Sequence, residues 1–413
     1  MNQENTNQAD TSQTNTEFSS RTEKLIYATA FFSLSNEVLM GLALPLLAVE
    51  RGLPATTLGM LFALAALGPI LLALPAGALC DHFGDKKVLL VLTSGIAVTA
   101  IIYPYVEQLA GLFVLQLVAG ICRNNAWVAV QSYMVRNAPP LTLRKMAGKF
   151  TFSVNLGLMI APVFGGVIYS TWGSTAAFGF MGFWGACYAL LTFLLPEQKD
   201  PTHDTQPAWK ICVQSYRAAM PIFLRPMLVL MLLLTLARMM SAGIDISFYA
   251  VYLDDIGLAA ATIGVLMTLM NGSATLGSLL ADPVAKRLGL IGAMTSTIAI
   301  SMIAIAVLPL FYSVWFIALV SILHGLSLGV SMPLLLTGIS QYSKPNERGL
   351  VLGLRSMFNR GGVMSAPLLL GFLVGGWGML SGFLVMGAMV LVLLAVIGIT
   401  ARFVNQSSAN EVS

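Results

Sequence analysis

Long apolar runs separated by short polar breaks occupy the chain from about residue 25 to residue 401. An α-helix needs roughly 20 apolar residues to cross the hydrocarbon core of a bilayer, and twelve runs meet that length. The pattern therefore predicts an all-α membrane protein. The predicted spans are 25–48, 56–79, 88–106, 109–134, 150–171, 175–195, 226–253, 260–281, 290–309, 313–341, 350–373 and 379–401.

Composition and charge support this interpretation and predict an orientation. The 413-residue chain is 57% hydrophobic, with a mean hydropathy of +0.82 and only 10% charged residues. Outside the predicted spans its basic residues fall on the tails and on alternate loops, whereas the opposite loops hold only Arg51. Under the positive-inside rule both termini are cytoplasmic. The net charge of +4 then reflects topology and not binding of nucleic acid. We expect a multi-pass protein of the plasma membrane, which is the inner membrane in bacteria.

An internal repeat divides the chain at a constant offset of 205 residues. GLPATTLGML at 52–61 matches GLAAATIGVL at 257–266, and GLMIAPVFGG at 157–166 matches GVMSAPLLLG at 362–371. One ungapped offset that links strings from several spans indicates two homologous halves.

The repeat and the polar segments together predict the domain organisation. Residues 1–23 are rich in Asn, Gln, Thr and Ser, without a cleavage site, and are expected to form a disordered cytoplasmic tail. An N-terminal six-helix bundle (24–195) and a C-terminal six-helix bundle (222–402) follow, joined by a polar cytoplasmic linker (196–221). A second cytoplasmic tail covers 403–413.

The loop GALCDHFGDKK (77–87) resembles the motif G-x-L-[AS]-D-[RK]-[FY]-G-[RK]-[RK]-[RK] between the second and third spans of the major facilitator superfamily. The matching residues are Gly77, Leu79, Asp81, Phe83, Gly84, Lys86 and Lys87, and the departures are Cys80, His82 and Asp85. The resemblance implies that Asp81 sits at the amino-terminal end of the eleventh span and latches the two halves. Gly84 permits a tight turn, and Lys86 and Lys87 hold the loop inside. The alternative is that these charges only set topology.

A second motif lies in the fifth predicted span. NLGLMIAPVFGG resembles the family's G-x-x-x-G-P-x-x-G-G, which is most associated with proton-coupled exporters. Its residues here are Gly157, Ala161, Pro162, Gly165 and Gly166, repeated in the second half by Ala366 and Pro367. The alternative is a packing seam, because small residues let helices approach closely. In the fourth span Gln116 replaces the family's arginine, and Arg123 lies two turns further on.

Ionisable residues deep inside spans usually have a function, because burying them is costly. We identify Glu37, Arg123, Arg238, Asp245 and His324. They lie in the first, fourth, seventh and tenth spans, which the family resemblance implies line a central cavity.

These residues suggest two roles. Glu37, Asp245 and His324 are candidates for proton coupling, since burial and nearby cations shift carboxyl protonation and histidine titrates near neutrality. The candidates for lining a substrate cavity are Asn36, Arg123, Asn124, Asn125 and Arg238. The alternatives are fixed pairs of Glu37 with Arg123 or of Asp245 with Arg238, and a His324 that is simply hydrogen-bonded.

Other chemistry is not indicated. No phosphate-binding loop G-x-x-x-x-G-K-[ST] occurs, so ATP is not predicted as the direct energy source. The three histidines and four cysteines lack metal-ligand spacing. We therefore expect no enzyme activity, no cofactor and no metal.

The sequence thus predicts a secondary active transporter of the major facilitator type. Two parallel repeats are typical of such transporters, with the substrate site at their interface. We expect proton-coupled export of a small organic molecule, such as a drug-like compound, metabolite or siderophore, by alternating access. The alternative is uptake of a small solute, including an anionic one, by proton symport. A sensor or assembly protein on the same scaffold is a third class. The expected partners are the solute, protons and membrane lipid, and the expected state is a monomer.

Overall fold

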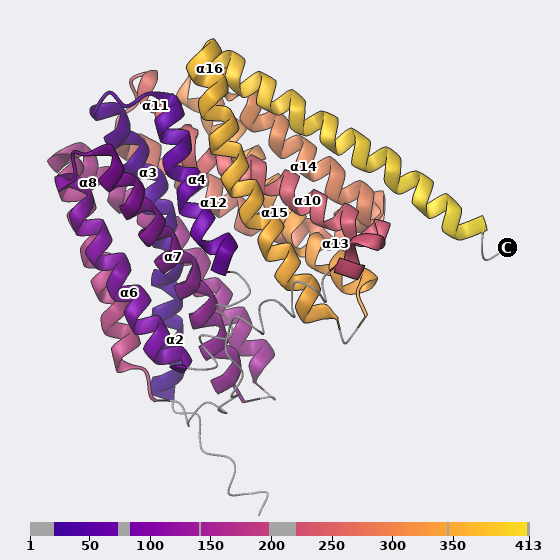
Figure 1. Cartoon of the computed structure of the whole chain (residues 1–413), viewed down its shortest axis with the longest axis horizontal. Coiled ribbons are helices and arrows are strands. Elements are labelled where there is room, and N and C mark those ends of the chain that lie inside the picture. The colour runs from indigo at the N-terminus through magenta and orange to yellow at the C-terminus, as the bar shows by residue number, and fades with distance from the viewer. Residues whose placement is uncertain (1–19, 73–82, 140–141, 198–219, 345–346, 411–413) are drawn as a thin grey trace, which may run out of the picture.

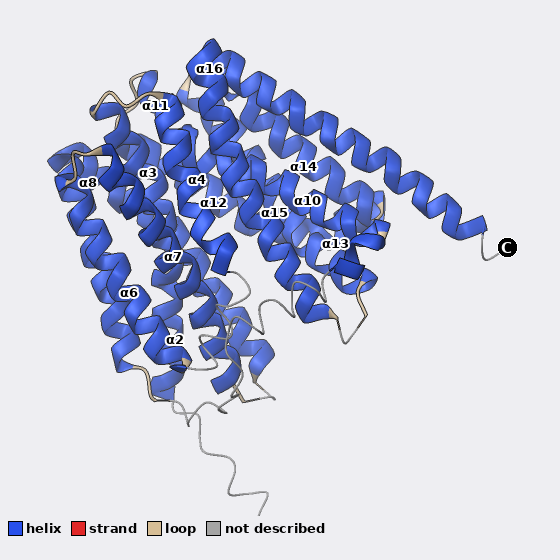
Figure 2. Cartoon of the chain, viewed as in Figure 1, coloured by secondary structure: helices blue, strands red, loops and turns tan. Residues whose placement is uncertain are grey.

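The computed structural model describes residues 20–72, 83–139, 142–197, 220–344 and 347–410. Over these ranges the chain folds into helices joined by short loops, without a strand (Figure 2). The all-α prediction is therefore confirmed.

Within the described residues of the N-terminal half there are six α-helices and one short 3₁₀ turn, η1 (Tyr103–Tyr105). The α-helices are α2 (Ser20–Ser33), α3 (Ser35–Glu50), α4 (Ala55–Leu72), α6 (Asp85–Ile102), α7 (Leu109–Asn137) and α8 (Leu143–Leu194). A single residue, Leu34, separates α2 from α3, and together they form one apolar stretch over Ser20–Glu50.

The C-terminal half, residues 220–410, has the corresponding order of helices. They are α10 (Pro226–Ile244), the π-helical turn η3 (Asp245–Tyr249), α11 (Ala250–Asp255), α12 (Ala260–Gly277), α13 (Ala281–Leu288), α14 (Leu290–Val307), α15 (Val314–Tyr342) and α16 (Arg348–Asn410). The short 3₁₀ turn η4 (Ser278–Leu280) joins α12 to α13.

Two helices are too long for one crossing. With a rise of about 1.5 Å per residue, α8 and α16 each exceed twice the roughly 30 Å of hydrocarbon. Each turns at a glycine with positive φ, Gly173 (79°) and Gly378 (81°). In the described ranges nine helices are long and apolar enough to cross a membrane, and Ala55–Ile70 is a shorter apolar one. If α8 and α16 cross twice and α4 crosses once, the predicted spans are all present, but the number twelve stays a prediction.

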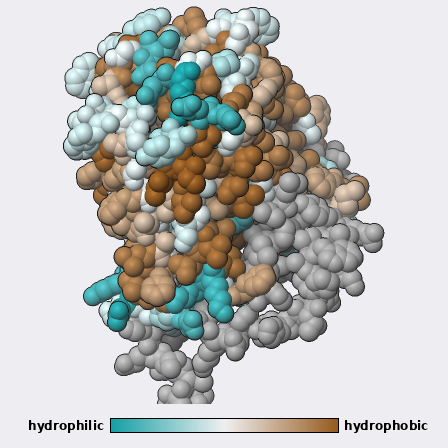
Figure 3. Space-filling model, turned by 60° about the vertical axis from the view of Figure 1, so that its left-hand side comes forward, coloured by the Kyte–Doolittle hydropathy of each residue, from teal (hydrophilic) through white to brown (hydrophobic). Residues whose placement is uncertain are grey.

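The surface agrees with a membrane environment. On the face in Figure 3 a hydrophobic belt runs between hydrophilic zones at the two ends of the molecule. Large apolar side chains are exposed on the helices, including Val91, Phe152 and Phe183. Such exposure is costly in water and favourable in lipid. The protein is therefore a multi-pass membrane protein.

The two halves meet at one end of the molecule. We call it the Arg51 end, because Arg51 there donates to the carbonyl oxygens of Pro104 (2.7 Å) and Val106 (2.6 Å). We call the opposite end, where α2 begins and α15 ends, the tail end. In Figure 1 the ribbons of the two halves converge toward the Arg51 end and diverge toward the tail end.

Backbone contacts between the halves occur in pairs related by the 205-residue offset. A Cβ on Gly59 of α4 would overlap the carbonyl oxygen of Pro367 of α16, and one on Gly264 of α12 would overlap that of Pro162 of α8. Gly59 is the repeat counterpart of Gly264, and Pro162 of Pro367. The same helix crossing therefore occurs twice. The glycine belongs to the N-terminal half in one crossing and to the C-terminal half in the other.

A third contact between the halves joins two residues that are counterparts of each other in the repeat. Gly41 of α3 packs on Ile246 of η3, since a Cβ on Gly41 would lie 3.2 Å from the carbonyl oxygen of Ile246. These two residues are themselves 205 apart. Their contact marks the approximate twofold relation between the halves. The boundaries of the predicted bundles and linker stay predictions.

We predict that Gly264→Ala weakens the joint between the halves. Its methyl group would overlap a backbone oxygen that cannot turn away, and overpacking of this kind costs about 1–3 kcal/mol. The thermal unfolding midpoint of the full-length protein in detergent should fall, and Gly59→Ala should have a similar effect. Gly179→Ala is the matched control, because nothing lies within 4 Å of its Cβ position. A Gly264→Ala protein that unfolds like the control would show that this crossing does not depend on close packing.

Candidate functional site

A small cavity lies between the halves and is lined by charged residues. Glu37 of α3 and Arg360 of α16 form an ion pair across the interface, with 3.6 Å between Glu37 Oε1 and Arg360 Nη1. Arg123 and Asn124 of α7 line the same cavity. Its volume of about 30 Å³ has room for ordered water but is far below the few hundred Å³ typical of ligand sites. In this conformation the cavity is therefore a polar junction.

The neutral residues of the predicted cavity are buried. The exposed fractions are 1% for Asn36, 7% for Asn124 and 6% for Asn125. The side-chain nitrogen and oxygen of Asn36 have no hydrogen-bond partner among the described residues. Gln116, which replaces the family's arginine, is fully buried and accepts a hydrogen bond from the Tyr103 hydroxyl. The cation in the middle of this helix is Arg123, which lines the junction with Glu37.

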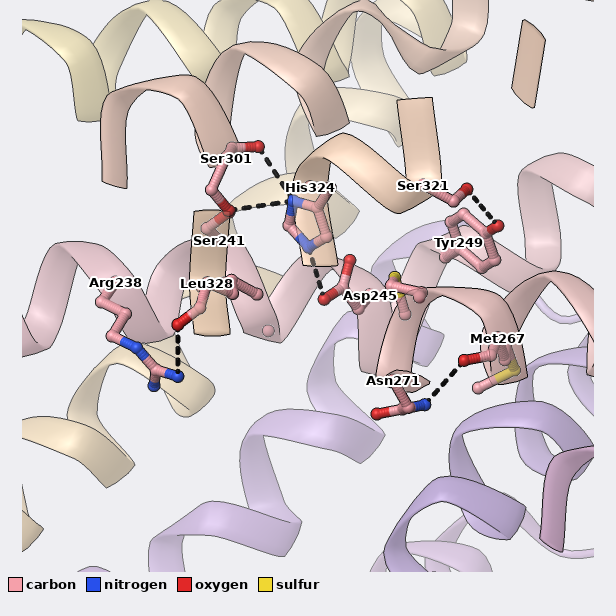
Figure 4. A network of polar contacts seen from close by, with 12 residues as sticks. Arg238, Ser241, Asp245, Tyr249, Met267, Asn271, Ser301, Ser321, His324 and Leu328 are labelled. Carbon is pink, nitrogen blue, oxygen red and sulfur yellow. Dashed lines mark hydrogen bonds and ion pairs between the residues drawn. The ribbon is translucent and has the colours of Figure 1, made fainter. Parts of the chain in front are cut away.

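A second polar unit lies inside the C-terminal half (Figure 4). His324 of α15 is completely buried, and its Nε2 lies 2.7 Å from Asp245 Oδ2 on η3. Its Nδ1 lies 2.9 Å from the carbonyl oxygen of Ser301 and 3.0 Å from the Ser301 hydroxyl, both on α14. Ser241 Oγ of α10 lies 3.0 Å from Ser301 Oγ. One imidazole thus joins three helices.

Ser301 can satisfy His324 in two protonation states. When the imidazole is neutral with its proton on Nε2, the Ser301 hydroxyl donates to Nδ1. When the imidazole is charged, Nδ1–H donates to the Ser301 carbonyl oxygen, which only accepts. In both states Nε2–H donates to the Asp245 carboxylate. The unit can therefore gain or lose one proton without moving its heavy atoms.

The π-helical turn η3 places Asp245 in this unit. Such turns insert an extra residue into a helix and occur often at functional sites. The Ser247 hydroxyl donates to the Gly243 carbonyl oxygen at 2.6 Å, which compensates part of the disrupted backbone ladder. Asp245 Oδ1 has no hydrogen-bond partner among the described residues, so the carboxylate has spare accepting capacity.

Arg238 lies on α10, seven residues before Asp245. Its Nε donates to Ser331 Oγ (2.8 Å) and its Nη2 to the Leu328 carbonyl oxygen (3.3 Å), both on α15. The fixed pair of Arg238 with Asp245 that the sequence left open does not form, because Asp245 contacts His324 instead. Glu37 likewise pairs with Arg360 and not with Arg123.

The predicted gating loop is only partly described. Gly77 and Asp81 lie outside the described residues. Gly84 has φ of 84°, which glycine adopts without strain, and α6 begins directly after it. Lys87 is exposed, and the Lys86 ammonium lies 5.8 Å from the centre of the Phe193 ring.

Asp85, one of the departures from the motif, has a structural partner. It is fully buried at the start of α6, and its Oδ2 lies 3.3 Å from Nε of Arg136 at the end of α7. An acidic residue in the first turn of a helix also interacts favourably with the helix dipole.

The residues of the fifth-span motif lie at helix contacts. Gly157 packs on the carbonyl of Phe31, and Gly165 packs on Leu39 and Leu42, within the N-terminal half. Pro162 and Gly166 contact α12 of the other half. Ala161 and Ala366 are fully buried, and Pro367 contacts α4. All seven therefore take part in packing in this conformation.

Two functional candidates were missed from the sequence. Arg355 and Arg360 lie in the predicted span 350–373, so ionisable residues are not confined to the first, fourth, seventh and tenth spans. The signal was available, since both are charges inside an apolar run. Within the described ranges, no group of three or more His, Cys, Asp or Glu residues is placed to hold a metal ion.

A bundle of apolar helices in two related halves, with buried charges at their interface, defines a membrane transporter. The family model of the Major Facilitator Superfamily matches residues 25–300 and 230–411. The chain belongs to the major facilitator superfamily and is a transporter of that family.

Individual relatives are distant. The chain is 26% identical over 175 residues to an uncharacterised MFS-type transporter of Methanocaldococcus jannaschii, covering 42% of this chain and 45% of that protein. It is 22% identical over 334 residues to Multidrug resistance protein 1 of Bacillus subtilis, covering 80% and 83%. The crystal structure of the nucleoside transporter NupG superposes with a TM-score of 0.74 at 14% identity, covering 92% and 99%. At this identity the superposition supports the fold alone.

We predict that Glu37→Gln depopulates the present conformation. Loss of a half-buried ion pair between the halves removes about 1 kcal/mol, which changes a conformational equilibrium about fivefold. Spin labels at the exposed positions Lys149 and Ser340, one in each half at the tail end, would report this change as a shift in the distance distribution. The labels require a background in which the four native cysteines are serine.

Arg360→Gln should cause a similar shift, and exchanging the two charges (Glu37→Arg with Arg360→Glu) should reverse much of it. If all variants give the wild-type distribution, the ion pair does not bias the two halves.

Proposed function

We propose that this transporter couples the movement of a small organic solute to protons by alternating access, with His324 and Asp245 as the proton-binding unit. The observation that carries the proposal is the pairing of Ser301 with His324. A buried histidine whose second ring nitrogen faces both a donor and an acceptor can bind and release a proton in place. A histidine with a purely structural role would need only one partner at this nitrogen, either the donor or the acceptor.

Coupling follows from the helices that carry the unit. Asp245 belongs to the η3 turn next to the interface, whereas His324 and Ser301 lie on α15 and α14. The neighbouring Ile246 packs against Gly41 of the other half. Rearrangement of the halves therefore acts on the segment that holds Asp245. Separating Asp245 from His324 removes the anion that stabilises the charged imidazole, which favours proton release.

We assign Glu37 a different role from proton carriage. Its carboxylate forms an ion pair with Arg360 of the other half and lies in one cavity with Arg123. Glu37 then acts as a latch between the halves. Proton coupling by Glu37 itself is the alternative.

Export in exchange for protons is the first candidate direction. It is supported by the relative called Multidrug resistance protein 1, which aligns over 80% of this chain, since removal of drugs from the cell produces resistance. A single chain supplies both halves of the polar junction, which supports action as a monomer. The proposed location stays the predicted inner membrane, with both termini in the cytoplasm.

Uptake of an anionic solute with protons is a second candidate, favoured by the balance of charge. Within the described helices, the interior positions carry the arginines 123, 238, 355 and 360 against the acids Glu37 and Asp245. An anion bound near this excess of positive charge would favour simultaneous protonation nearby, as symport requires.

The proton-binding unit can be tested without a known solute. The chain has three histidines, His82, His203 and His324, so replacing the first two by Gln leaves one. We predict that ¹⁵N NMR of this protein shows a neutral Nε2–H imidazole at high pH and an imidazolium at low pH. Asp245→Asn should lower the pH of that change. A single form from pH 5 to pH 9 would contradict the proposal.

Transport should depend on the same residues. In everted vesicles acidified inside, addition of ethidium or benzenesulfonate should release protons if the protein is an antiporter, as read by a pH-sensitive dye. We predict that His324→Gln and Asp245→Asn abolish this release. Ser321→Ala, one turn away on α15, removes hydrogen bonds with the Tyr249 hydroxyl and the Ile317 carbonyl oxygen but none with His324 or Asp245, and it is the control. A solute that enters with protons only when the outside is acidic indicates symport.

A further inference from the structure

Two arginines of the C-terminal half converge on one stretch of α15. Arg238 of α10 donates to Ser331 Oγ, and Nη2 of Arg355 of α16 lies 3.1 Å from Sδ of the next residue, Met332. Ser331 and Met332 are neighbours, so the two guanidinium groups approach the same part of the helix from two different helices. Both arginines are partly exposed.

Neither arginine has a carboxylate partner in the part of the chain that the structure describes. The two interior acids are engaged elsewhere, Glu37 with Arg360 and Asp245 with His324. The partners of Arg355 are also poor, because a thioether sulfur is a weak acceptor. Its Nε is buried without a hydrogen-bond partner. Leaving a buried donor of a charged group unsatisfied is destabilising unless an acceptor is supplied.

The pair is displaced from the proton-binding unit toward the tail end. Arg238 precedes Asp245 by seven residues on a helix that runs from the tail end, and Ser331 follows His324 by seven residues on a helix that runs toward it. Seven residues correspond to about 10 Å along a helix. The Glu37 junction is a separate feature, since its own acid already balances one of its two arginines.

We infer that Arg238 and Arg355 form a binding subsite for an oxyanion group of the transported solute, which makes the solute class organic anions such as carboxylates, sulfonates or phosphate esters. The inference rests on the proposed function, because it assumes that the solute passes along the interface between the helix bundles. Guanidinium groups bind planar oxyanions through paired N–H donors, and Arg355 has such donors free. A bound oxyanion would supply both the acceptor and the counter-charge that the site lacks.

Direct binding tests the subsite without a proton gradient. The full-length protein in an uncharged detergent would be titrated calorimetrically with phthalate and benzenesulfonate, and with the isosteric neutral probes phthalamide and benzenesulfonamide. We expect the anions to bind at least tenfold more tightly than the amides. Arg238→Gln and Arg355→Gln should each weaken anion binding at least tenfold. Arg287→Gln removes an exposed arginine of α13 and should bind like wild type.

Arg355→Lys keeps the charge and guards against a folding defect. It should elute as a monodisperse protein and bind the anions more weakly than wild type but more tightly than Arg355→Gln, because lysine lacks the planar fork. Equal binding of anions and amides, or unchanged binding in both glutamine variants, would overturn the inference. So would binding of phosphatidylglycerol at the arginines with no binding of the soluble anions, since the ligand would then be a lipid.

The outcome can be separated from that of the proposed function. If the wild-type protein binds the anions no more tightly than the amides while His324 shows a normal ¹⁵N titration, the subsite alone is overturned. Anion binding that is lost in both glutamine variants, together with a His324 that does not titrate, supports the subsite and overturns the proton-binding unit.

Discussion

The structure depends on close backbone contact between two halves that gain little from hydrophobic burial. In lipid, apolar side chains are equally well solvated on either side of an interface, so helix association relies on packing and on polar contacts. At the crossings of α4 with α16 and of α8 with α12, glycine lets one helix lie directly on a carbonyl of the other. Contacts of this kind need no interlocked side chains, so the interface can separate at small cost. A protein that alternates between conformations requires such a joint.

The repeat preserves the joint but not the chemistry. Gly59 and Gly264 correspond, as do Pro162 and Pro367, and each pair makes equivalent contacts. The position that holds His324 in the second half is Ala119 in the first, and both are fully buried. Arg238 corresponds to Ser33, and Glu37 to Ala242. The scaffold of the halves is therefore common, whereas the proton-binding unit and the arginine pair belong to the second half alone.

The apolar runs and the 205-residue offset were sufficient to predict an all-α membrane protein with two homologous halves, and the resemblance of the loop 77–87 to a family motif indicated the family. The sequence also predicted breaks between residues 171 and 175 and between residues 373 and 379, and the structure has a non-helical residue in each, Gly173 in α8 and Gly378 in α16. Among site residues, the sequence identified Glu37, Asp245 and His324 as unusual but could not assign their partners. Glu37 meets Arg360 and Asp245 meets His324 across helices far apart in the chain, and such pairings depend on tertiary packing. Arg355 and Arg360 were recognisable as charges within an apolar run.

The distribution of charge connects the two polar features of the C-terminal half. A buried His–Asp pair that is satisfied in both protonation states tolerates a change of one charge without rearranging. The arginine pair is the opposite case, because Nε of Arg355 is buried without a hydrogen-bond partner among the described residues. Both features contact α15, and Asp245 and Arg238 belong to one continuous helical segment. A charge gained at one feature therefore changes the electrostatic free energy at the other over roughly 10 Å of low-dielectric protein. The η3 turn, which holds Asp245, packs on α3, and α16, which holds Arg355, packs on α4, so each feature has a residue on an element that forms the joint between the halves.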